Sequence, residues 1–352
     1  MTSNRFVVLD GLRGVAALVV LVFHLAEQRS LASAPPFAAL AVDFFYVLSG
    51  FVVAFAYEQK LRTGSISLGD FAAVRVRRLY PLLFLGTFAG IALGVLAVVA
   101  KHDVSLMQIA MAGGLALLVL PSFVFSQWAT AYPFNMAAWS LTFEVFINAV
   151  YAVLVRWLSN RLLIVIIASS GVLLACLFLN EGGIAGGNNQ SNFWLGFPRV
   201  IYPFFCGVLL YRFRPQQRMR SRAALFLLFI LPAFLMAYWP WYTYISIAYV
   251  VALFPLIVFL GSACGVQGSL LAGCNIAGEL SYPVYILQGP VLRIGEEILK
   301  YRHLGTFPFL AFACFEALTV IVISWFALKR FDEPLRLLMR TRKRRKVALQ
   351  QD

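Results

Sequence analysis

Long apolar stretches recur throughout this chain of 352 residues, and they constrain its fold more than any other feature. Each runs for about 18 to 22 residues, the length that an α-helix needs to cross a hydrocarbon layer of about 30 Å. Hydrophobic residues make up 61% of the chain and charged residues 12%, so a soluble domain of this length could not bury its apolar surface. The sequence therefore predicts an all-α, polytopic bundle whose solvent is the lipid bilayer.

Eleven apolar stretches are candidate spans, at about 6–26, 42–58, 79–100, 105–126, 137–155, 162–180, 197–211, 223–239, 243–262, 276–294 and 307–328. The fourth is the weakest, because Gly113, Gly114 and Pro121 interrupt it. We predict ten crossings, with the fourth stretch forming a re-entrant or surface-lying hairpin. Lipid tolerates such a break only where the broken backbone is buried against protein or a wet cavity.

The net charge of +14 is concentrated between the spans, and positive charge marks cytosolic loops. Residues 60–78 and 212–222 carry five Lys or Arg each, and 340–346 read RTRKRRK, whereas 26–41 and 181–192 carry little positive charge. The first three segments are therefore placed in the cytosol, and ten crossings put both termini there. Because membrane orientation accounts for the charge, we expect no nucleic-acid partner.

We expect one domain, since the chain shows no linker, low-complexity segment or internal repeat. It covers 1–335 and is followed by a basic cytosolic tail at 336–352. The cysteines lack metal-ligand spacing, so we interpret them as packing residues and expect neither a metal site nor a disulfide framework. They are Cys176, Cys206, Cys264, Cys274 and Cys314.

Ionisable side chains inside the spans are candidate functional residues, because each costs about 2.5 to 3.5 kcal/mol to insert. Arg13 and His24 lie in the first span, eleven residues apart. At about 100° and 1.5 Å per residue, they share one helix face to within about 20° and are separated by about 16 Å. Arg13 is placed near the cytosol and His24 near the outer side, along one path.

Two carboxylates are predicted at about the depth of His24. Asp43 lies at the outer start of the second span, and Glu144 lies about two turns into the fifth. Asp43 facing His24 would fix the tautomer of the imidazole and raise its basicity, as in a general-base pair. Each residue alone could instead bond to a neighbouring helix, but three at one depth favour a catalytic site.

Arg75 and Arg78 lie one turn apart at the cytosolic end of the third span, with Arg77 between them. Guanidinium groups donate paired hydrogen bonds to phosphate oxygens. The alternative is that these arginines only satisfy the positive-inside rule. Coenzyme A fits Arg13, Arg75 and Arg78, because its nucleotide end is anionic and its pantetheine arm could reach a deep histidine.

Five motifs in order resemble those of the acyltransferase 3 family of bacterial membrane acyltransferases. They are LDGLRGVAALVVLVFHL with Arg13 and His24, VDFFYVLSGF at 42–51 with Ser49, RVRRLYPL at 75–82, AAWSLTFEVF at 137–146 with Trp139 and Ser140, and SYPVYILQGPV at 281–291 with Tyr282. The resemblance implies an acyl-CoA donor, commonly acetyl-CoA, with His24 as the essential base and the arginines engaged with the donor or its path.

The resemblance also implies a hydroxyl-bearing acceptor at the bacterial inner membrane. The acceptors of such enzymes include O-antigen, exopolysaccharide, peptidoglycan and other glycans, and some members modify macrolides. Ser49, Trp139, Ser140 and Tyr282 then become candidate substrate-binding residues. The chain departs from the family where many members carry a histidine and it has Gln288.

Two alternatives remain open from the sequence. In a secondary transporter the same charges would relay protons or hold a solute, although such proteins usually show repeated halves with paired broken helices, and no such duplication is visible here. In an enzyme of the same chemistry the acceptor would be a small cytosolic molecule such as an antibiotic. The sequence also leaves open whether His24 acts as a base or first accepts the acyl group itself.

Overall fold

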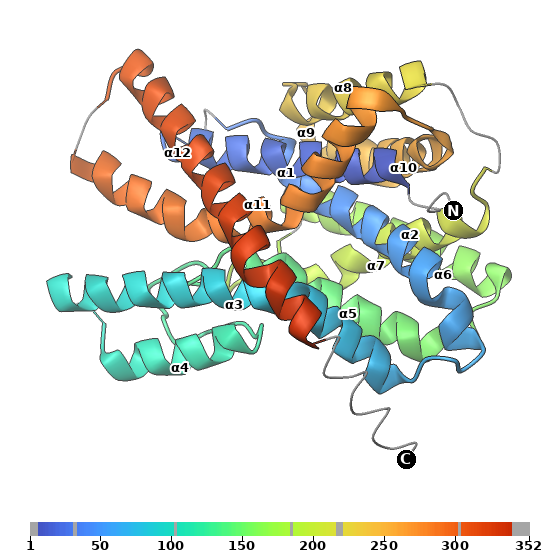
Figure 1. Ribbon diagram of the computed structural model, residues 1–352, viewed down its shortest axis with the longest axis horizontal. Coiled ribbons are helices and arrows are strands. Elements are labelled where there is room, and N and C mark those ends of the chain that lie inside the picture. Colours follow the sequence, from blue (N-terminus) through green and yellow to red (C-terminus); the bar gives the residue numbers. More distant parts are fainter. Residues whose placement is uncertain are drawn as a thin grey trace.

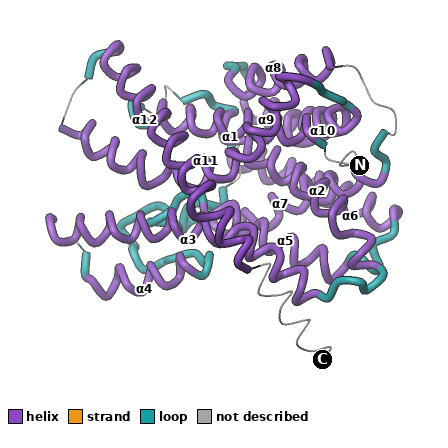
Figure 2. Tube along the Cα trace, in the orientation of Figure 1, coloured by secondary structure: helices purple, strands orange, loops and turns teal. Residues whose placement is uncertain are grey.

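The computed structural model describes residues 6–30, 34–101, 104–183, 186–215, 221–301 and 304–339. These residues form helices joined by loops, with no strand among them, which confirms the all-α prediction (Figures 1 and 2). The basic run at 340–346 lies outside the described residues. Its cytosolic location therefore remains a prediction.

The helices follow the predicted spans closely. They are α1 Val7–Glu27, α2 Ala41–Arg62, α3 Leu68–Lys101, α4 Leu106–Leu117, α5 Ala138–Leu154, α6 Asn160–Glu181, α7 Gly196–Arg212, α8 Ser221–Met236, α9 Tyr242–Ala248, α10 Phe254–Ala263, α11 Gly268–Tyr301 and α12 Thr306–Ala327. A π-helical turn at Tyr249–Leu253 joins α9 to α10, and another at Leu328–Asp332 continues α12.

The fourth predicted span becomes the short helix α4, which has 12 residues. A helix of this length reaches about 18 Å, well short of the hydrocarbon thickness of about 30 Å. It packs beside α3 (Figure 1). Within the described residues eight helices are long and apolar enough to cross a membrane. The apolar helices α5 and α8 are shorter, and the predicted ten crossings require both of them to cross as well. The chain is a polytopic helical membrane protein.

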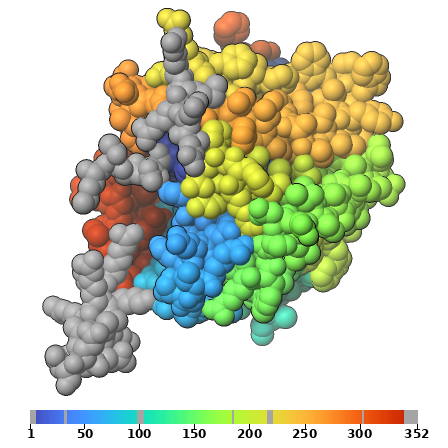
Figure 3. Space-filling model, turned by 90° about the vertical axis from the view of Figure 1, so that its right-hand side faces the viewer, coloured from blue at the N-terminus to red at the C-terminus, as the bar shows by residue number. Residues whose placement is uncertain are grey.

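Loops rich in arginine meet at one end of the bundle, which we call the cytosolic end. Arg62 of α2 donates from Nη2 to the Leu158 carbonyl at 2.6 Å, in the loop between α5 and α6. Arg212 at the end of α7 donates from Nη1 to Asn160 Oδ1 at 2.8 Å. In Figure 3 the blue segment of α2 lies beside the green segments of α5 and α6.

The loops at the opposite end are also bonded to one another. The loop between α4 and α5 meets the loop between α6 and α7, where Ala131 N donates to the Asn188 carbonyl at 2.9 Å. Gln190 Nε2 donates to the Phe125 carbonyl at 2.7 Å. These two loops thus form one outer layer that covers the start of α5.

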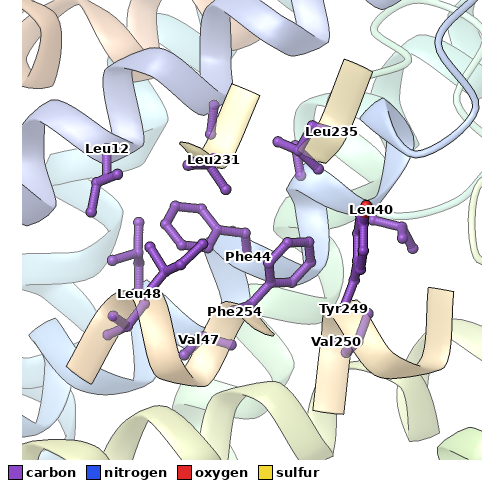
Figure 4. Packing of buried hydrophobic residues seen from close by; sticks show 14 of the residues in the cluster. Leu12, Leu40, Phe44, Val47, Leu48, Leu231, Leu235, Tyr249, Val250 and Phe254 are labelled. Carbon is purple, nitrogen blue, oxygen red and sulfur yellow. The ribbon is translucent and has the colours of Figure 1, made fainter. Parts of the chain in front are cut away.

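Helices α2 and α7 pack closely through glycines. A Cβ at Gly50 would lie 1.9 Å from the Phe204 carbonyl oxygen, and one at Gly207 would lie 2.0 Å from the Val47 carbonyl oxygen. Small residues allow such backbone contact between helices in lipid. Apolar side chains of α1, α2, α8 and α10 fill the space behind this pair, including Leu12, Phe44, Leu231 and Phe254 (Figure 4).

Helix α11 contains Pro283 and Pro290, and Figure 1 shows it bent along its length. Because Pro290 has no N–H, the Ile286 carbonyl loses its intrahelical donor. Asn135, buried in the loop before α5, donates from Nδ2 to this carbonyl at 3.2 Å. The asparagine thus satisfies a backbone acceptor that the proline leaves without a partner.

We expect Asn135→Ala to lower the free energy of unfolding by about 1 to 3 kcal/mol, the cost of leaving a buried carbonyl unsatisfied. Pro290→Ala restores the missing N–H. In the Pro290→Ala variant, Asn135→Ala should therefore lower the free energy of unfolding by a smaller amount. Thermal unfolding of the wild type, both single variants and the double variant in one detergent measures the difference. Equal losses in the two backgrounds would show that Asn135 does not serve the proline.

Candidate active site

A cavity of about 730 Å³ lies between α1, α2, α3, α5 and α11. Its wall follows α2 from Tyr57 to Val42, which is about 22 Å at about 1.5 Å per residue. At one end it reaches Arg336, near the cytosolic end of the last helix. At the other it comes within one turn of the outer start of α2, so it runs through most of the bundle.

Most of the predicted site residues share this cavity. Its wall contains Arg13, Ser49, Arg75, Arg78, Ser140, Glu144 and Tyr282. These residues come from five helices. The sequence grouped Arg13, Arg75 and Arg78, but it did not show that Glu144 would join them. His24, Asp43 and Trp139 are not part of the wall.

Glu144 pairs with Arg75 in the cavity wall. Its Oε1 atom accepts from Arg75 Nη2 in a short ion pair and from Ser49 Oγ at 2.8 Å. The prediction that Glu144 meets His24 was wrong, because Glu144 faces α2 and α3 instead. The pairing also neutralises the charge of Arg75 within the cavity wall.

Arg13 is held against α11. Its Nε atom donates to Ser281 Oγ and its Nη2 atom to the Gly278 carbonyl, both at 2.8 Å. Nη2 also lies 3.0 Å from Asp10 Oδ1, one turn earlier on α1. Close packing brings these groups within reach, since a Cβ at Gly278 would lie 2.6 Å from Asp10 Cβ. The guanidinium is therefore fixed in position at the cavity wall.

Arg78 differs from the other two arginines. Its carbonyl oxygen accepts from Arg336 Nη2 at 2.9 Å, but within the described part of the chain its guanidinium has no hydrogen-bond or ion-pair partner. The residue is exposed and lines the cavity. Its donors are thus available to an anionic ligand.

Hydroxyl groups and aromatic rings line the outer part of the cavity. Ser140 Oγ lies 2.8 Å from Tyr285 Oη, and Tyr46 Oη donates to the Ser140 carbonyl at 3.3 Å. Phe45 packs edge-on against Tyr285, with 5.6 Å between ring centroids.

Tyr282 lies nearer the cytosol and donates to the Leu79 carbonyl at 2.5 Å. Tyr46 and Tyr285 were not predicted as site residues, although both lie in motifs that the sequence shows.

His24 lies in the last turn of α1 with Glu27 as its partner. The distance from His24 Nδ1 to Glu27 Oε2 is 3.0 Å, and the histidine side chain is 27% exposed. The predicted pairing with Asp43 was therefore wrong. Residues three apart on a helix are neighbours on its surface, and this places a carboxylate beside the ring without a second helix.

Asp43 pairs instead with Arg199 of α7. Arg199 Nε lies 2.9 Å from Asp43 Oδ1 and Nη2 lies 2.5 Å from Oδ2, with side-chain exposures of 2% and 0%. The guanidinium lies over the Trp139 ring, 5.4 Å from its centroid, and Nη1 donates to the Gly186 carbonyl at 3.3 Å. Trp139 thus contacts this buried pair rather than the cavity.

Arg199 is the most important residue that sequence reasoning missed. The signal was present, because a single arginine near the start of the apolar stretch 197–211 needs a partner inside the membrane. The structure joins it to the aspartate of the second motif. This pair connects α2, α7 and the loop before α7.

Comparisons with known proteins agree with the motifs. The chain is 38% identical over 184 residues to "Protein 2 in picA locus" from Rhizobium radiobacter, a match that covers 49% of this chain and 93% of that protein. No solved structure matches. The family pattern described as an acyltransferase domain matches residues 6–328, from the start of α1 to the end of α12. This match covers most of the chain, and most of the motif residues gather around one membrane cavity, so the chain belongs to the acyltransferase 3 family and is a membrane acyltransferase.

Proposed function

We propose that this enzyme transfers an acyl group, most simply acetyl, from cytosolic acyl-CoA to a hydroxyl of an extracytoplasmic glycan or related acceptor at a bacterial inner membrane. The cavity carries the proposal, because it joins arginines near the cytosolic end to the outer start of α2. Family membership supplies the reaction class and favours transfer over solute transport.

The donor would enter between Arg13 and Arg78. The guanidinium of Arg78, which has no partner among the described residues, offers paired donors to a phosphate, and Arg13 is already oriented by its bonds to α11. Arg75 contributes less, since Glu144 neutralises it. The pantetheine arm would follow α2 towards Ser140 and Tyr285, where hydroxyl groups can orient the thioester.

His24 would act from the outer end of α1. With Nδ1–H donated to Glu27, Nε2 is the basic nitrogen. It would take the proton of the acceptor hydroxyl as that oxygen attacks the thioester carbonyl. The C–S bond then breaks, and the leaving thiolate takes the proton from the imidazolium to give free CoA. In the covalent alternative, Nε2 itself attacks first.

The direct test follows label from acyl-CoA to acceptor with purified enzyme in lipid nanodiscs, using cell-envelope glycan fractions as acceptors. We expect Arg78→Ala to raise KM for acyl-CoA by about 10- to 100-fold, as expected for charged hydrogen bonds worth about 1.5 to 3 kcal/mol. Arg161→Ala is the matched control, because this exposed arginine starts α6 away from the cavity. A wild-type enzyme that transfers no label from acyl-CoA would contradict the donor assignment.

Glu27→Gln should lower kcat by at least about tenfold with little change in KM for acyl-CoA, because the amide no longer selects the basic tautomer of His24. The corresponding exchange in a serine-protease triad costs about 10⁴-fold, and the His24 pair is more exposed, so a smaller loss is expected. Partial activity in Glu27→Asp would support positioning by a carboxylate. Glu297→Gln, in an exposed pair with Lys300, should leave kcat unchanged, and an equal loss there would contradict the assignment.

A further inference from the structure

A second, smaller cavity of about 230 Å³ adjoins the large one at the cytosolic end of α1. The two share four wall residues, Arg13, Leu48, Val52 and Arg78. Two guanidinium groups therefore stand where the cavities meet. A ligand with anionic groups in its middle could place one end in each cavity and its charges between them.

The walls that belong to the small cavity alone are aromatic and acidic. Phe6 and Phe55 meet edge-on, with ring centroids 5.0 Å apart, and Leu9 and Asp10 complete the lining. The Asp10 carboxylate is 3.0 Å from Arg13 Nη2, and its oxygens are hydrogen-bond acceptors in the cavity lining. This combination of flat apolar surfaces and an acceptor at one edge suits an aminopurine ring.

The position of the small cavity argues against an acyl-chain pocket. Asp10 and His24 are fourteen residues apart on α1, so they are separated by about 21 Å at about 1.5 Å per residue. An acyl group held beside Asp10 would be out of reach of the imidazole. An adenine base there would lie at the cytosolic entrance, with the rest of the donor extending towards His24.

We propose that the small cavity binds the adenine base of the acyl-CoA donor, with Arg13 and Arg78 on its diphosphate and the pantetheine arm in the large cavity. This inference rests on the proposed acyl-CoA donor. Phe6 and Phe55 supply the faces for the base, and Asp10 accepts from its exocyclic amino group. The adenosine part of the donor thus contributes binding far from the reacting carbonyl.

Truncated donors test the inference. S-acetyl-CoA carries the base, whereas S-acetyl-4′-phosphopantetheine ends at the first phosphate. We expect Phe55→Leu to raise KM for acetyl-CoA by about 5- to 100-fold, the range of aromatic stacking on a base, and to leave KM for acetyl-phosphopantetheine unchanged. Phe84→Leu is the control, since this phenylalanine of α3 is exposed and lines neither cavity.

The outcomes separate the two proposals. A wild-type enzyme that uses neither donor contradicts the acyl-CoA function itself. A wild-type enzyme that uses acetyl-CoA, combined with a Phe55→Leu effect on both donors or on neither, overturns only the adenine site.

A photolabel keeps the test valid if Phe55→Leu does not fold. Acetyl-CoA with an 8-azidoadenine base should crosslink wild-type enzyme within residues 6–13 or 48–55, which line the small cavity. Excess unlabelled acetyl-CoA should prevent the crosslink. Specific crosslinks confined to other segments would overturn the assignment.

Discussion

Replacing His24 with alanine is expected to lower kcat for acyl transfer by about 10²- to 10⁴-fold, the usual contribution of a positioned general base. Binding of CoA should be unchanged, because His24 lies about 16 Å from Arg13 along α1. The fold should also persist, since the ring is partly exposed and its partner Glu27 is on the same helix. Single-turnover transfer from labelled acyl-CoA and calorimetric titration with CoA measure the two effects.

An active His24→Ala enzyme would remove the imidazole from the mechanism. Loss of CoA binding together with transfer would instead indicate a role in donor binding or in folding. The covalent alternative predicts that labelled acyl-CoA acylates the enzyme itself in the absence of acceptor. That label should be lost in His24→Ala and kept in the Arg161→Ala control.

Breaking the Asp43–Arg199 pair should produce the largest loss of stability, about 3 to 5 kcal/mol for Asp43→Leu or Arg199→Met alone, because each leaves an uncompensated buried charge. The double variant Asp43→Leu/Arg199→Met should recover much of this loss, since apolar side chains can replace a buried ion pair. Apparent unfolding temperatures in detergent give the comparison. The exposed Glu297–Lys300 pair is the control, and its loss should cost at most about 1 kcal/mol.

Activity of the double variant distinguishes a structural pair from a catalytic one. The structure keeps Asp43 and Arg199 outside the cavity wall, so a folded double variant should retain transfer. A stable but inactive double variant would return Asp43 to the catalytic residues predicted from the sequence. If the double variant lost as much stability as the two single variants together, the charges of Asp43 and Arg199 would not stabilise one another.

The spans could be predicted because length and hydropathy alone determine which segments cross a bilayer. Pro121 likewise lies shortly after the end of α4 at Leu117, whereas Gly113 and Gly114 are accommodated inside the helix. The depth of a residue within the membrane could also be estimated from its position in the helix, since the rise per residue is constant. These local properties were enough to place Arg13, Arg75 and Arg78 together near the cytosolic end of the bundle.

The partners of the buried charges could not be predicted, because depth does not say which way a helix is rotated. His24 and Asp43 both lie at the outer ends of their helices, yet one bonds within α1 and the other to α7. Contacts such as Gly50 against Phe204 fix that rotation, and they depend on packing between distant segments. Glu144 was misplaced in depth as well, since it was predicted at the level of His24 and pairs instead with Arg75 of α3.

The two walls of the large cavity differ in how firmly they are held. On one side α2 touches the backbone of α7 at Gly50 and Gly207, so it cannot retreat without breaking that contact. On the other side α11 packs closely on α1 at Gly278, but beyond that point it lacks two backbone donors, at Pro283 and Pro290, and is bent. Bulkier acyl groups would therefore be accommodated by displacing the part of α11 that contains Pro283 and Pro290, and how far this part can bend sets the limit on acyl-group size.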